Sequence, residues 1–100
     1  MRGEEAVKPK SDTGFYQALA ELERTITNHR SKQADVARAY AHVLEQERLF
    51  TGPQGSFIYI ARINRMIVMR WSPAGLERVK KMAWDLRAAA DSLDSPPAKR

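Results

Sequence analysis

The sequence contains no cysteine and only two histidines. The lack of cysteine excludes a disulfide framework, thiolate metal sites and cysteine nucleophiles. The two histidines, His29 and His42, stand thirteen residues apart, and no metal-ligand motif can be built from that spacing. We therefore predict a protein with no metal site and no cofactor.

Long hydrophobic runs are missing as well. The longest candidate, residues 57–71, is interrupted by Arg62, Asn64, Arg65 and Arg70, whereas a membrane-spanning helix needs about 18 consecutive apolar residues. The first ten residues are polar and do not resemble a signal peptide. These absences predict no membrane partner and a cytoplasmic location.

Motifs for catalysis are also lacking. The chain has no glycine-rich phosphate loop, and its serines lie in no recognisable nucleophile motif. His42 has Glu45 at helical spacing, but an ordinary solvated helix face explains this pair. We therefore predict that the protein is not an enzyme.

The length and composition indicate one small domain. One hundred residues, 43% of them hydrophobic, are enough for a single core but not for two. The polar start, with Gly3 and Pro9, predicts a flexible tail over residues 1–11. The two prolines near the end predict a second tail over 94–100, which leaves a domain at 12–93.

Two apolar stripes in the first half have helical spacing. Steps of three and four residues connect the members of each stripe, which are Phe15, Leu19, Leu22 and Ile26, then Val36, Tyr40 and Val43. Because the stripes share one register, the segment is either a single helix over 14–49 or two helices with a break near 28–31. Two helices are favoured, since an uncapped helix of about 35 residues is unusual in a compact domain. A stripe this regular also allows a homodimer.

The segment 57–71 permits two interpretations. As a helix it has a clean apolar stripe at Ile60, Ile63, Ile67 and Trp71, and this interpretation is favoured. As a β-hairpin turning near Ile63 it would give an α+β fold that resembles a winged helix in outline, but it lacks the usual hairpin turn residues and would be apolar on both faces.

The last element is the clearest helix. Ser72 is a good N-cap and Pro73 suits the first helical position, so a helix is predicted over about 73–93. Its stripe contains Leu76, Val79, Ala83, Leu86, Ala90 and Leu93, of which Leu76 and Leu86 are expected to be buried. The predicted fold class is therefore mostly α, a small domain of three or four helices with flexible termini.

The charge is distributed unevenly. Residues 1–50 contain eight Lys/Arg and eight Asp/Glu, whereas residues 51–100 contain nine and four, so the whole net charge of +5 lies in the second half. The cations that concentrate between 57 and 87 are Arg62, Arg65, Arg70, Arg78, Lys80, Lys81 and Arg87, beside only two anions. A basic surface of this kind binds phosphate backbones, which predicts binding to DNA or RNA in a regulatory or accessory role.

Two details and one alternative accompany this hypothesis. Arg70 and Gly75 flank the predicted helix start at Ser72, where free N–H groups could hold a phosphate, although an ordinary capped helix explains the same residues. Trp84 falls off its apolar stripe, so it is either covered by the first half or exposed as an interface anchor. The alternative function is a protein–protein interaction module, with the cations only a solvated helical face.

Overall fold

The computed structural model describes residues 3–50 and 55–94, with side chains described for 12–50 and 55–90. It contains three helices, α1 (Gly3–Thr27), α2 (Gln33–Glu47) and α3 (Phe57–Asp94), and no strand occurs within those ranges. The prediction of a mostly α fold is confirmed.

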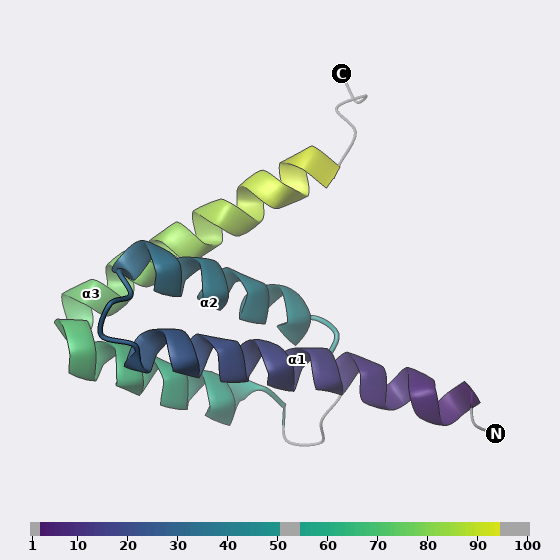
Figure 1. Cartoon of the computed structure of the whole chain (residues 1–100). Helices are drawn as coiled ribbons and strands as arrows, with labels where there is room; N and C mark the ends of the chain where they lie inside the picture. The colour runs from purple at the N-terminus through teal and green to yellow at the C-terminus, as the bar shows by residue number, and fades with distance from the viewer. Residues whose placement is uncertain (1–2, 51–54, 95–100) are drawn as a thin grey trace.

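Helix α3 is bent sharply at one residue. Ser72 has φ 75° and ψ 169°, outside the helical region, and Pro73 follows it. The bend divides α3 into a first arm (57–71) and a second arm (73–94), which diverge as a V in Figure 1. The boundary predicted at Ser72-Pro73 is therefore correct, and counting the two arms separately gives four helical rods.

The hairpin interpretation of 57–71 is wrong. The first arm is helical throughout, and Ile63 and Ile67 are fully buried on one face. Residues four apart lie one turn apart on the same face of a helix, so both side chains pack against a single core.

The first half forms two helices, as predicted, and polar side chains define the break between them. The Asn28 side chain accepts a hydrogen bond from the Arg30 backbone N–H at 3.0 Å. The Asp35 carboxylate accepts one from the Lys32 backbone N–H at 2.9 Å and so caps the start of α2. Short polar side chains that bond to nearby backbone groups compete with the helical ladder, and this ends α1 at Thr27.

The N-terminal boundary of α1 differs from the prediction. The expected flexible tail covered residues 1–11, but α1 begins at Gly3 and includes Pro9. Once the stripe from Phe15 has fixed the helix, the added residues other than Pro9, which has no N–H to donate, each contribute one hydrogen bond without a new nucleation cost. At the other end α3 stops at Asp94, close to the predicted 93, and residues 95–100 of the second predicted tail lie outside the described part.

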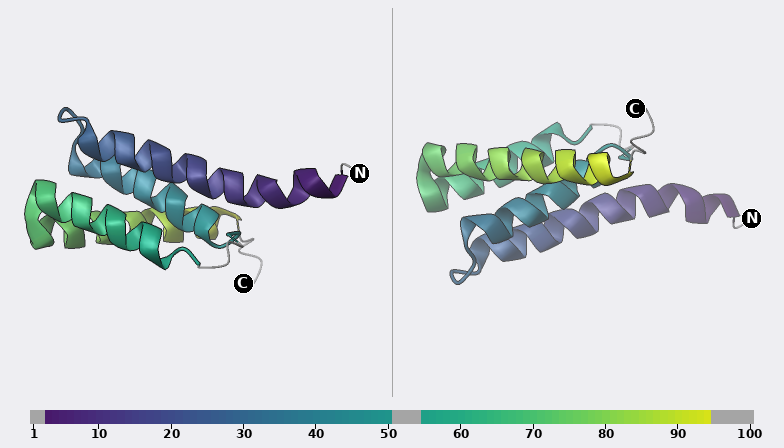
Figure 2. Two further views of the ribbon diagram at one scale, coloured as in Figure 1. Left: turned by 90° about the horizontal axis from the view of Figure 1, so that it is seen from below. Right: turned by 90° about the horizontal axis from the view of Figure 1, so that it is seen from above.

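The helices form two layers. In both views of Figure 2, α1 and α2 lie together on one side and the two arms of α3 lie on the other. The smallest dimension of the molecule, 23 Å, matches two layers of helices, each about 10–12 Å across.

The core lies between these layers. Both stripes of the first half are fully used in it, as are Ile63, Ile67, Val79 and Ala83. The apolar register from Phe15 to Val43, which suggested a dimer, is therefore buried within one chain. Tyr40 is buried there too, and its hydroxyl donates to Asn64 Oδ1 at 2.6 Å; burial raises the pKa of this hydroxyl to about 12.

The burial of Leu86 was predicted wrongly. Its side chain is 42% exposed, and Ala90 one turn later is also exposed. Of the stripe on the second arm, Val79 and Ala83 are fully buried and Leu76 only partly. The reason is geometric, because the second arm leaves the other helices as it proceeds from the bend (Figure 1).

Candidate nucleic-acid interface

Arg62 and Arg65 lie on the solvent side of the first arm. The Arg62 guanidinium pairs with the Glu23 carboxylate of α1 at 3.1 Å, and both side chains remain accessible to solvent. Arg65 is exposed and makes no ion pair or hydrogen bond with the residues described. The first arm contains no acidic residue, so Arg65 lies in locally positive surroundings.

Arg70 has a structural role that the sequence analysis did not foresee. Its guanidinium donates four hydrogen bonds of 2.7–3.0 Å to the backbone carbonyls of Ile26, Asn28, His29 and Ser31. These carbonyls belong to the end of α1 and the connection to α2, where the partial charge of the helix end is negative. Four of the five N–H donors of Arg70 are thereby used. We therefore exclude Arg70 from the candidate interface.

Gly75, which was predicted to form a phosphate position with Arg70, also has a structural role at the bend. A Cβ added at Gly75 would lie 2.3 Å from the Cβ of Trp71, so glycine is needed here for the close contact across the bend. The Arg70 guanidinium also lies 4.2 Å from the centre of the Trp71 ring. Arg70, Trp71 and Gly75 together hold the bend, and this accounts for their pattern without a bound phosphate.

The remaining cations of the second arm contact polar or aromatic groups, and two of them lie beside carboxylates. Arg78 Nε donates to Gln33 Oε1 of α2 at 3.0 Å. Lys80 Nζ is 4.0 Å from the Glu77 carboxylate, and Lys81 Nζ is 3.2 Å from that of Asp85. The Arg87 guanidinium lies 5.6 Å from the centre of the Trp84 ring.

Trp84 is exposed and is not covered by the first half of the chain. Its side chain is 52% accessible. A tryptophan this accessible is uncommon, because its large apolar ring is usually well buried.

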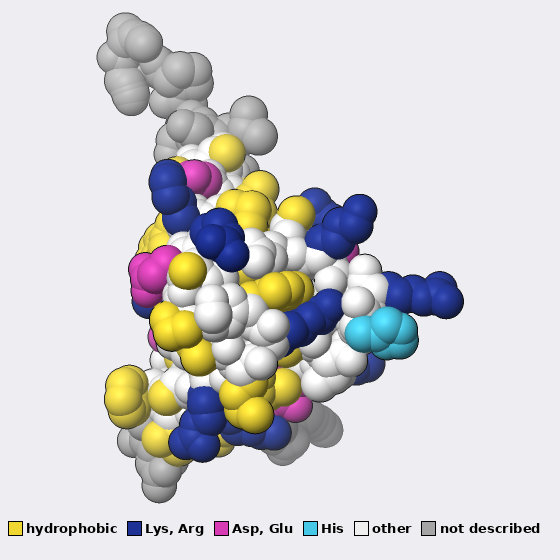
Figure 3. Space-filling view, turned by 90° about the vertical axis from the view of Figure 1, so that its left-hand side faces the viewer, with side chains coloured by type: hydrophobic (Ala, Val, Ile, Leu, Met, Phe, Trp, Pro, Cys, Tyr) yellow, Lys and Arg dark blue, Asp and Glu magenta, His cyan; other side chains and the backbone are white. Residues whose placement is uncertain are grey.

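Two further cations, which were not predicted from the sequence, lie at the end of the molecule that carries the bend. Arg30 and Lys32 are exposed in the connection between α1 and α2, and the contacts of Ser31 with Arg70 and of Gln33 with Arg78 place this connection beside α3. Figure 3 views this end, where basic side chains surround apolar surface and acidic ones are fewer. The first half is neutral in sum, so only a prediction of this tertiary contact could have found them.

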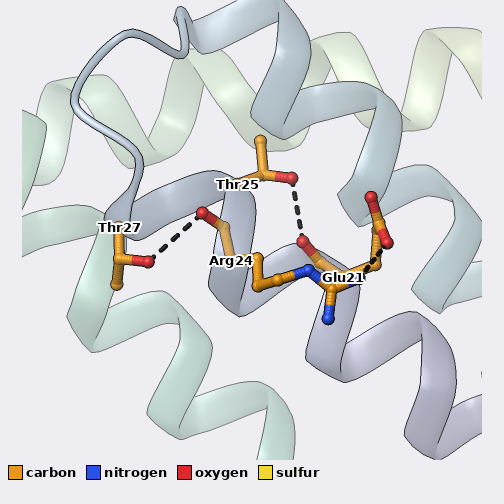
Figure 4. Close-up of polar contacts among 4 residues, drawn as sticks. All are labelled: Glu21, Arg24, Thr25 and Thr27. Carbon is orange, nitrogen blue, oxygen red and sulfur yellow. Dashed lines mark hydrogen bonds and ion pairs between the residues drawn. The ribbon is translucent and has the colours of Figure 1, made fainter.

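A polar hollow beside the end of α1 is lined by no candidate catalytic side chain. It has a volume of about 410 Å³ and is lined by Glu21, Arg24, Thr25, Thr27, Asn28 and Ser31. Figure 4 shows that its polar groups bond to one another: Arg24 pairs with Glu21, and the two threonine hydroxyls donate to backbone carbonyls one turn earlier. No histidine or unpaired carboxylate lines it.

Neither a metal site nor a membrane span is present in the described part of the chain. No group of three or more metal-ligating side chains occurs within the described ranges. None of the helices described is both long and apolar enough to cross a bilayer. Comparison of the chain with protein-family models, with curated proteins and with solved structures gives no match.

Proposed function

We propose that this protein binds nucleic acid, DNA or RNA, through the cations of α3, without catalysing a reaction and in a cytoplasmic setting. One observation carries the proposal: once Arg70 is excluded, α3 still presents six cations against two anions between 57 and 87. The six are Arg62, Arg65, Arg78, Lys80, Lys81 and Arg87.

The ion pairs on α3 do not prevent this binding. Pairs between exposed side chains contribute about 0–1 kcal/mol, so a phosphate can replace the carboxylate of Glu23 or Asp85 at small cost. Each phosphate neutralised also releases counterions from the nucleic acid, which favours association at low salt. Arg65 needs no such exchange, because no described residue pairs with it.

The experiment is a salt titration of binding to duplex DNA, followed by fluorescence anisotropy of a labelled duplex. If about four cations contact phosphates, log K should fall with log salt with a slope near −3 to −4. Arg65→Gln should weaken binding and flatten the slope by about one unit. Arg38→Gln, a matched change on α2, should have much less effect. Failure of about 10 µM protein to bind duplex or single strands at ~50 mM salt would refute the proposal.

A protein–protein interaction module is the second candidate, and a different observation favours it. Phe57 is 76% and Met69 80% exposed on the first arm. A groove of about 300 Å³ between α2 and the second arm is lined in part by Ala41, Leu86 and Ala90. Accessible apolar surface of this kind is typical of interaction sites. Capture of the same proteins from lysate with and without nuclease treatment would favour this function over nucleic-acid binding.

A further inference from the structure

The surroundings of Trp84 combine an accessible aromatic ring with positive charge. Lys80 and Lys81 precede it by four and three residues, and Arg87 follows by three, so all three share its face of the helix. Lys81 is 77% exposed, and the Arg87 guanidinium lies against the ring at 5.6 Å. The neighbour four residues later is Ala88, which is exposed and small, so one side of the ring has no bulky neighbour on this helix face.

This arrangement fits a nucleic-acid base better than a duplex. In a duplex the bases are stacked on one another, and an indole ring on a helix surface can reach only the backbone and the groove edges. In a single strand each base has an accessible face, and stacking on an aromatic side chain is the usual way in which proteins hold it. Cations at this spacing then contact the phosphates on either side of the stacked base.

We propose that Trp84 is a stacking platform for a base of single-stranded nucleic acid, with Lys80, Lys81 and Arg87 binding the adjoining phosphates. The inference rests on the proposed nucleic-acid function and names its ligand class. Charge complementarity favours this ligand, because three cations flank the ring, and the pairs that Lys80 and Lys81 form with Glu77 and Asp85 are exposed and contribute little.

The test is a titration with an oligothymidylate of about 16 nucleotides and with a duplex of the same length, followed by tryptophan fluorescence and by anisotropy. The single strand should quench the fluorescence of the native chain, because a base stacks on the exposed indole. Trp84→Phe should keep most of the affinity, since phenylalanine can also stack, but should lose the quenching. The remaining Trp71 is partly buried at the bend and serves as an internal control.

Trp84→Ala gives the decisive comparison. It should weaken single-strand binding roughly 5- to 100-fold and leave duplex binding within about twofold. Phe57→Ala, which removes another exposed ring of α3, is the matched control and should leave both affinities unchanged. Circular dichroism of both variants checks that the helices persist.

Two results would overturn the inference in distinguishable ways. Duplex binding as tight as single-strand binding, with Trp84→Ala without effect on either, would refute the stacking platform and leave the proposed function in place. No binding of either nucleic acid would refute both, and Trp84 would then be assigned to a protein interface.

Discussion

The two arms of α3 have the same apolar spacing but very different burial. On the first arm Ile63 and Ile67 are completely buried, whereas on the second arm burial stops after Ala83 and Leu86 is 42% exposed. Periodicity therefore identifies the face that a helix can bury, but a neighbouring element must be present for that face to be covered. The first arm has such neighbours around Ile63 and Ile67, whereas beyond Ala83 an open groove lies between the second arm and α2.

Polar contacts show the same division. The first arm is connected to α1 through Arg62 and Arg70 and to α2 through Asn64. The second arm has one hydrogen bond to another helix among the contacts described, from Arg78 to Gln33 near its beginning. The first arm thus supports the fold, and the second arm is free to present side chains to a ligand.

The largest expected effect is that of Ile67→Ala on the first arm. Ile67 is fully buried, and truncation leaves a cavity that the surrounding helices only partly fill, so unfolding should become easier by about 2–5 kcal/mol. Urea denaturation followed by circular dichroism measures this. A variant as stable as the parent would show that the first arm is not part of the core, and the contrast between the arms would be lost.

Substitution of Arg70 is expected to reduce stability by somewhat less than Ile67→Ala. Arg70→Ala removes a charged donor from four carbonyls and should destabilise the protein by roughly 2–4 kcal/mol. Arg70→Lys should restore only part of this, because an ammonium group cannot reproduce the planar fork of donors. Thermal and urea denaturation of the pair give the comparison. If lysine restores full stability, the positive charge alone is sufficient and the four-carbonyl geometry is unimportant.

The smallest effect is expected for Leu86→Ala on the second arm. The sequence predicted a core residue here, but its exposure limits the loss to less than about 1 kcal/mol. The same denaturation series should therefore place this variant close to the parent and far from Ile67→Ala. A loss as large as that of Ile67→Ala would mean that a second element covers the far end of this arm in solution.

The sequence was most informative where local chemistry decides the structure. Ser72-Pro73 predicted the boundary within α3, and the polar residues near Asn28 predicted the break between α1 and α2. The buried registers of the first half and of the first arm also followed from spacing alone. Each of these depends on residues close together in the chain.

Two of the errors concern contacts between distant residues. Arg70 looked like a surface cation because the carbonyls that it binds are 39 to 44 residues away and carry no signal in the sequence. Leu86 looked like a core residue because periodicity cannot show that the second arm diverges. The candidate interface was found as a set of cations, but which of them face solvent was decided by the tertiary fold.

The hydrogen bonds of Arg70 also have a consequence for the order of folding. They join a guanidinium of the first arm to carbonyls of the α1–α2 connection, so they can form only after that connection has its final shape and a loop of about 40 residues has closed. Interactions that form late are absent from the transition state, and they slow unfolding rather than accelerate folding. Arg70 should therefore mainly lengthen the lifetime of the native state. The bend of α3 should accordingly open only rarely.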